Sequence, residues 1–179
     1  MRGIIIYKSK YGATKQYAGW LSQALDLPIV SSDEVLKGEL QKYDCILLGT
    51  SVYFAKFKLK SWLWHNRKAL INKKIFLFIV NATSPDETGK RNNVIKHNVP
   101  PELKPYCKFF FLPGSIIHEK LSLRDKFILK LADGFEKSPI KGKALHEDIN
   151  GVKKENLLPL INEVQLSCTN MVKWQMHAV

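Results

Sequence analysis

Cysteine is scarce in this sequence, and no apolar run is long. Three cysteines occur among 179 residues, at positions Cys45, Cys107 and Cys168. Their odd number and wide spacing exclude a disulfide framework and a cysteine-based metal site, and they are typical of a reducing compartment. The longest apolar runs, at 75–80 and 109–112, have strand length and fall short of the roughly 20 residues that span a bilayer. We therefore expect a cytoplasmic protein without a secretory signal, a transmembrane helix or a metal.

Acidic residues are also few. Lysine and arginine number 28 against 16 aspartates and glutamates, which gives a net charge of +12. No acidic residue occurs between positions 45 and 85, where these basic residues fall: Lys56, Lys58, Lys60, Arg67, Lys68, Lys73 and Lys74. A field of one sign attracts nucleic acid, an acidic membrane surface, or a small carboxylate or phosphate. The alternative is a solvated basic face that only aids solubility.

Short β-branched runs alternate with amphipathic runs along the chain. Strands are predicted at 3–8, 28–30, 43–49, 73–80 and 106–114, and helices at 13–25, 58–70, 92–98, 121–135 and 152–166. This alternation predicts right-handed crossovers and a parallel sheet covered by helices on both faces. We expect an α/β fold of three layers, with a doubly wound five-stranded parallel sheet in the order 2-1-3-4-5. No linker or repeat divides the chain, so residues 1–179 are predicted to form a single domain with a core at 3–166 and a tail at 167–179.

Open sheets of this kind bind ligands beyond the carboxyl ends of their strands, where the strand order reverses. In the predicted order the reversal lies between the first and third strands. The loops to consider are therefore 9–14, 50–57 and 81–91.

The first loop, SKYGAT at 9–14, leads from a strand into a helix. The start of a helix has unpaired N–H groups and a partial positive charge, which suit a phosphate. Gly12 allows a close backbone approach, while Ser9 and Thr14 offer hydroxyls and Lys10 a positive charge. With one glycine and no Gly-Lys-Ser/Thr sequence, the loop favours a monophosphate over a dinucleotide. The alternative is an ordinary turn in which Thr14 caps the helix.

The second and third loops follow the third and fourth predicted strands. In the second, Tyr53 and Phe54 stand where the chain leaves the sheet and suit stacking on a flat ring. Phe57 is expected to fold back onto the core, and for Tyr53 both roles stay open. The third loop offers the polar side chains of Asn81, Thr83 and Ser84 to a ring edge, and its alternative is a plain surface loop.

Taken together, these loops resemble those of the flavodoxin superfamily of FMN-binding domains. The pattern [ST]-x-x-G-x-T, which holds the FMN phosphate in that family, is matched by Ser9, Gly12 and Thr14. The resemblance implies a flavodoxin-like fold and noncovalent FMN as the cofactor. The residues that it implies for the cofactor are Ser9, Lys10, Tyr11, Gly12, Ala13 and Thr14 at the phosphate, and Thr50, Ser51, Val52, Tyr53, Phe54, Asn81, Ala82, Thr83 and Ser84 around the ring.

A narrower resemblance is to the menaquinone-dependent protoporphyrinogen oxidases. It rests on GTSVYF at 49–54, FLFIVN at 76–81 and the basic amphipathic segment at 113–135. It implies an FMN-dependent oxidoreductase that oxidises protoporphyrinogen with a quinone as acceptor. The alternatives are an electron carrier of the flavodoxin type without its own substrate, and a flavin-free anion- or nucleic-acid-binding module. No nucleic-acid-binding motif occurs, so we expect no nucleic-acid partner.

Several features leave two interpretations open. Segment 121–135 is predicted to pack on the sheet or to dock on an anionic membrane through Arg124, Lys126 and Lys130, which would place the protein at the inner face of the membrane. We expect a redox partner or a small anionic substrate. Trp64 lies off the apolar stripe of its helix and is predicted to be exposed, and the alternative is that a neighbouring loop covers it. His65 and His118 are the nearest histidines to the loops, but a lone histidine is more often structural, so no catalytic residue is assigned.

Overall fold

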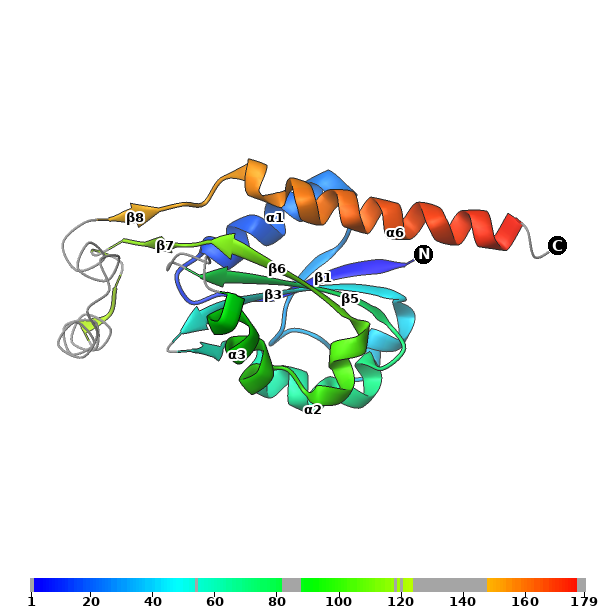
Figure 1. Ribbon diagram of the computed structural model, residues 1–179, viewed down its shortest axis with the longest axis horizontal. Helices are drawn as coiled ribbons and strands as arrows, with labels where there is room; N and C mark the ends of the chain where they lie inside the picture. The colour runs from blue at the N-terminus through cyan, green and yellow to red at the C-terminus, as the bar shows by residue number, and fades with distance from the viewer. Residues whose placement is uncertain are drawn as a thin grey trace.

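The computed structural model describes residues 2–53, 55–81, 88–117, 119, 121–123 and 148–176. Its centre is a parallel sheet in the order β2-β1-β3-β5-β6 (Figure 1). The strands are β1 Gly3–Lys8, β2 Ile29–Ser31, β3 Cys45–Tyr53, β5 Lys74–Asn81 and β6 Cys107–Pro113. The predicted order 2-1-3-4-5 is confirmed, because the two-residue strand β4, Lys56–Phe57, only shifts the numbering and pairs antiparallel with β3.

Helices cover both faces of the sheet, which makes a three-layer α/β/α fold (Figure 1). One face carries α1 (Ala13–Leu25) and α6 (Leu158–Met176). The other face carries α2 (Lys60–Leu70) and α3 (Thr88–Asn98), with short 3₁₀ turns η1 (Glu39–Lys42) and η2 (Pro101–Tyr106) nearby. A third such turn, η4 (Lys154–Leu157), precedes α6.

The apolar core forms two layers, one on each face of the sheet. Alternate residues of β1 divide between them: Ile4 and Ile6 pack with Leu63 of α2, whereas Ile5 packs with Tyr17 of α1. This division follows from the period of two in a strand, which sends successive side chains to opposite faces. Both faces are buried along most of β1, β3 and β5, and these strands are correspondingly rich in apolar residues, as expected for buried parallel strands.

Two helices differ from their predicted bounds. α3 begins at Thr88, before the predicted position 92, and α6 extends to Met176, so most of the predicted tail is helical. Pro159 is tolerated because it lies in the first turn of α6, where its missing N–H has no partner in the helix. Of the predicted helix 121–135, residues 124–135 lie outside the described part of the chain.

A two-stranded extension leaves the sheet after β6. It pairs β7 (Ser115–Ile116) antiparallel with β8 (Ile149–Asn150) and projects beyond the sheet (Figure 1). The hydroxyl of Tyr17, fully buried on α1, ties its base to the fold, donating to the carbonyl of Pro113 at 2.9 Å and accepting from the side-chain amide of Asn156 at 2.8 Å. These hydrogen bonds therefore anchor the segment that leads from the extension to α6 against α1.

Candidate functional site

The loop between β1 and α1 makes a tight turn at Gly12. Gly12 is the N-cap of α1 and has φ +96°, in the left-handed region that favours glycine. Its N–H donates to the hydroxyl of Ser9 at 3.0 Å, and its carbonyl accepts the first bond of the helix from Gln16 at 2.9 Å. The backbone N–H of Gly12 is thus bonded within the protein and is not one of the N–H groups at the helix start that can hold an anion. The amides of Ala13 and Thr14, which precede the first helical donor, have no partner within the helix.

The hydroxyl of Thr14 has no hydrogen-bond partner among the described residues, although Thr14 is fully buried. The interpretation of Thr14 as a helix cap is wrong, because Gly12 occupies that position and no side chain caps the helix. A buried hydroxyl without a partner destabilises the fold by about 1–3 kcal/mol. The Thr14 hydroxyl therefore lacks a hydrogen-bond acceptor among the residues that the structure describes. A bound anion such as a phosphate can provide that acceptor.

Other buried polar atoms share this state. The hydroxyls of Tyr11 and of Ser51, at the end of β3, are also buried without a partner in the described part of the chain, as are Ser32 Oγ and Arg91 Nε. Tyr11 and Thr14 belong to the first predicted loop and Ser51 to the second. Lys8 is the register partner of Thr50, so β1 and β3 end side by side. Tyr11, Thr14 and Ser51 therefore belong to chain segments at the carboxyl ends of two adjacent strands.

Tyr53 brings the first and second loops into contact. Lys10 Nζ lies 3.6 Å from the centroid of its ring and Lys58 Nζ lies 5.5 Å from it, which are cation–π distances. Tyr53 is half-buried, so it stands at the margin of the site and outside the core. Phe57, in contrast, is 3% exposed and packs in the core, as predicted.

The second loop is a β-hairpin, which the sequence analysis did not predict. β4 pairs with the end of β3, with Val52 opposite Phe57 and Tyr53 opposite Lys56. Phe54 lies outside the described residues. A side chain at Gly49, in the middle of β3, would collide with the ring of Phe78, which explains the glycine that opens the GTSVYF motif.

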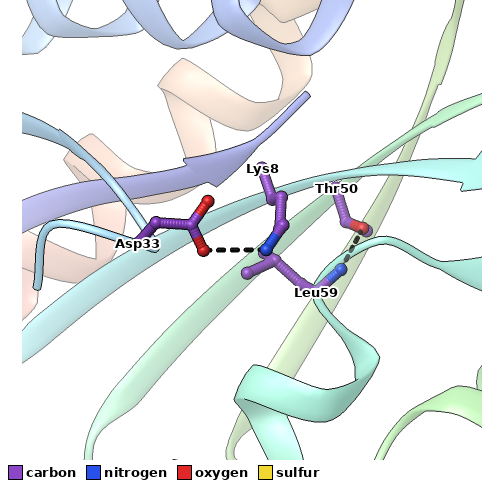
Figure 2. A network of polar contacts seen from close by, with 4 residues as sticks. All are labelled: Lys8, Asp33, Thr50 and Leu59. Atoms are coloured by element: carbon purple, nitrogen blue, oxygen red, sulfur yellow. Dashed lines mark hydrogen bonds and ion pairs between the residues drawn. The ribbon is translucent and has the colours of Figure 1, made fainter. Parts of the chain in front are cut away.

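Thr50 is the predicted ring contact that the structure corrects. It is fully buried, and its hydroxyl accepts a hydrogen bond from the N–H of Leu59 at 3.2 Å, where α2 begins. Its backbone lies within the ladder between β1 and β5. Figure 2 shows this contact beside the ion pair of Lys8 with Asp33, whose atoms are 2.7 Å apart. Thr50 therefore fixes the end of β3 against α2 and offers no group to a ligand.

The third loop is described only at its first residue. Asn81 ends β5, and its carbonyl accepts a hydrogen bond from the N–H of Gly114 at 2.8 Å. Ala82, Thr83 and Ser84 lie outside the described residues, as does His118. His65 is exposed on α2, and Trp64 beside it is 41% exposed, as predicted.

Two features are absent from the described residues. These residues contain no group of three or more His, Cys, Asp or Glu side chains that could hold a metal ion. None of their helices is both long and apolar enough to cross a membrane.

Comparisons with known proteins add a family match. A family model for the flavodoxin domain matches residues 4–139. An uncharacterized protein of Methanocaldococcus jannaschii is 29% identical over 79 residues, which are 44% of this chain and 53% of that protein, so the chain spans about half of that relative.

Two solved flavodoxins are similar in structure. A two-electron reduced flavodoxin of Megasphaera elsdenii has 16% identity and a TM-score of 0.46 over 62% of this chain and 83% of its own. A flavodoxin from the domain Archaea has 15% identity and a TM-score of 0.42 over 81% of this chain and 94% of its own.

Proposed function

The chain belongs to the flavodoxin domain family, and from this premise we propose that it binds FMN noncovalently and transfers electrons through it. The observation that carries the proposal is the buried, unpartnered hydroxyl of Thr14 at the start of α1. When bound, FMN would supply the redox chemistry, while the protein provides binding, orientation and electrostatics.

The phosphate end of the cofactor fits the β1–α1 loop. The amides of Ala13 and Thr14 and the hydroxyl of Thr14 would donate to the phosphate oxygens. The Ser9 oxygen accepts from Gly12, which leaves the Ser9 O–H proton available as a further donor. Lys10 would add positive charge. These donors are all short and local, so a single phosphate suits them better than a pyrophosphate.

The flavin ring of the cofactor fits the carboxyl end of β3, where Tyr53 is the last residue. Tyr53 would face the flavin ring, and Ser51, Val52 and Asn81 would line its border. Lys10 and Lys58 both lie against the Tyr53 ring and bring positive charge to this edge. Reduction adds negative charge to a flavin, so these cations favour its reduced form.

The test is a titration of the apoprotein with FMN and with riboflavin, followed by quenching of flavin fluorescence. We expect FMN to bind more tightly than riboflavin, because only FMN has a phosphate for the Thr14 position. A protein that stays colourless and quenches neither ligand in excess would reject the proposal and would favour the flavin-free anion-binding module.

A second candidate is an enzyme that oxidises protoporphyrinogen with a quinone as acceptor. The GTSVYF motif supports it, because its described residues form the end of β3, beside the proposed ring position. Turnover of protoporphyrinogen and a quinone by the purified holoprotein distinguishes this enzyme from a carrier without its own substrate.

Charge suggests the partners of the protein, and the few, widely spaced cysteines suggest its location. We propose an acidic redox partner or a small anionic substrate, a cytoplasmic location, and peripheral contact with anionic membranes through segment 121–135. Co-sedimentation with anionic vesicles at low salt tests the membrane contact, and a protein that stays in the supernatant rejects it.

A further inference from the structure

The hairpin between β3 and β4 turns on residues that do not favour its geometry. The register pairs Tyr53 with Lys56, which leaves Phe54 and Ala55 to connect the strands. Two-residue hairpin turns need positive φ and are therefore usually built from glycine, asparagine or aspartate. Ala55 has φ +55°, in the left-handed region that L-residues with a Cβ disfavour. Such a conformation persists only where the surrounding structure holds it.

The side chain of Asn98, the last residue of α3, holds this turn. Asn98 is 1% exposed. Its Oδ1 accepts from the N–H of Phe57 at 2.8 Å, and its Nδ2 donates to the carbonyl of Ala55 at 2.7 Å. The same Nδ2 donates to the carbonyl of Val94 at 2.7 Å, one turn back on α3. Both Nδ2 protons and one lone pair are thus used, which sets the orientation of the amide.

We propose that Asn98 is a positioning residue for the bound flavin ring. The inference rests on the proposed function, in which Tyr53 faces that ring. Tyr53 directly precedes the turn that Asn98 holds, and its ring meets Lys10 from the proposed phosphate loop. Without the Asn98 contacts, the strained turn relaxes and Tyr53 moves relative to that loop. α3 therefore acts on the ring through the hairpin.

The first test is Asn98→Ala, which leaves the Phe57 N–H and the Ala55 carbonyl without their partner. We expect FMN and riboflavin both to bind about tenfold more weakly, by the same factor, because none of the Asn98 hydrogen bonds reaches the donors of the phosphate loop. The matched control is Val99→Ala, which shortens the next side chain, 1% exposed in the core, and touches none of the Asn98 hydrogen bonds. It lowers the melting temperature but leaves both affinities within about twofold of the wild type.

The second test is Asn98→Asp, which preserves the shape of the side chain. A neutral carboxyl accepts from Phe57 and donates to one carbonyl, whereas an ionised one only accepts and faces two carbonyl oxygens. Riboflavin affinity of this variant should be near the wild type at low pH and fall as pH rises through the carboxyl pKa. Riboflavin is the probe because it lacks the phosphate, which itself titrates near pH 6. Wild-type affinity should stay flat over the same range.

A third measurement needs no flavin. In apoprotein with Asn98→Ala, amide hydrogen exchange at Phe57 should accelerate, while the amides of Ile46 and Leu48 in the fully buried part of β3 keep their protection. Wild-type flavin affinity in Asn98→Ala, or an equal loss in Val99→Ala, overturns the positioning role alone. A wild-type chain that binds neither flavin overturns the proposed function and the positioning role together.

Discussion

At the scale of single residues, the most informative atom is the hydroxyl of Thr14. A buried hydroxyl that finds no partner weakens the fold, so its presence has to be explained by something other than stability. Tyr11, which follows β1, and Ser51, near the end of β3, carry two more such hydroxyls. A ligand that accepts hydrogen bonds would satisfy them, and the first turn of α1 points to an anion.

Thr14→Val removes the hydroxyl and nearly keeps the shape. We expect FMN to bind about 10- to 100-fold more weakly, because a hydrogen bond to a charged group contributes about 1.5–3 kcal/mol, while riboflavin binding is unchanged. The free energy of unfolding of the apoprotein should stay equal or rise. Fluorescence titration and urea denaturation measure the two quantities. Ser32→Ala, which removes another buried and unpartnered hydroxyl, is the control, and an equal effect on FMN there would contradict a specific role for Thr14.

Cys107 makes the free energy of unfolding depend on pH in the alkaline range. Burial raises the pKa of its thiol to about 12, above the value of about 8.5 for an exposed thiol. The folded state therefore holds the proton more tightly, and this contribution to stability is complete below about pH 8.5 and is lost as pH rises toward 12. Cys107→Ser should show a shallower fall in the free energy of unfolding between pH 8.5 and 11. Parallel curves for the two proteins would mean that the thiol has no such effect.

At the scale of secondary-structure elements, apolar periodicity explains which features were predictable. Strands buried on both faces and helices with one apolar stripe leave clear patterns, so the strand order and both helical layers followed from the sequence. The β3–β4 hairpin did not, because Phe54 and Ala55 are not turn-forming residues and the contact that holds the turn comes from Asn98, 43 positions beyond Ala55. The burial of Thr50 was missed for a related reason, since only the tertiary structure brings Leu59 to its hydroxyl.

The hydroxyl of Tyr17 links α1 to the two ends of the β7–β8 extension, at Pro113 and Asn156. Tyr17→Phe removes the hydroxyl that donates to the Pro113 carbonyl and accepts from Asn156 and from the N–H of Lys153. Each of these groups loses that hydrogen bond, although the Asn156 amide keeps its bond to the Gly151 carbonyl. We expect the free energy of unfolding to fall by about 1–3 kcal/mol in urea denaturation. The FMN affinity should stay within about twofold of the wild type, since Tyr17 packs in the core behind the loop. A large loss of FMN binding at unchanged stability would instead place Tyr17 in the site.

At the scale of the whole molecule, the charge distribution bears on the redox potential of the proposed flavin site. The net charge is +12, and the chain from 45 to 85 contains no carboxylate. Among the described residues of this stretch, Lys58 comes within 5.5 Å of the Tyr53 ring at the proposed ring edge, whereas Lys73 and Lys74 lie at the opposite end of the sheet, where β5 begins. Salt screens charges beyond about 8–10 Å, so local cations matter more than net charge. The family match alone does not reveal this, because it concerns the fold.

We therefore expect the midpoint potential of bound FMN to exceed that of an acidic flavodoxin and to depend on Lys58. Lys58→Gln removes an attraction that favours the reduced flavin, and a loss of about 1.4 kcal/mol would lower a two-electron potential by about 30 mV. Lys42→Gln is the matched control, because it makes the same change in net charge at the other end of β3, about 25–30 Å away by strand length. A redox titration of both holoproteins at low and high salt separates the two effects. If both variants shift the potential equally, net charge governs it, and if neither does, the cations around Tyr53 do not tune the flavin.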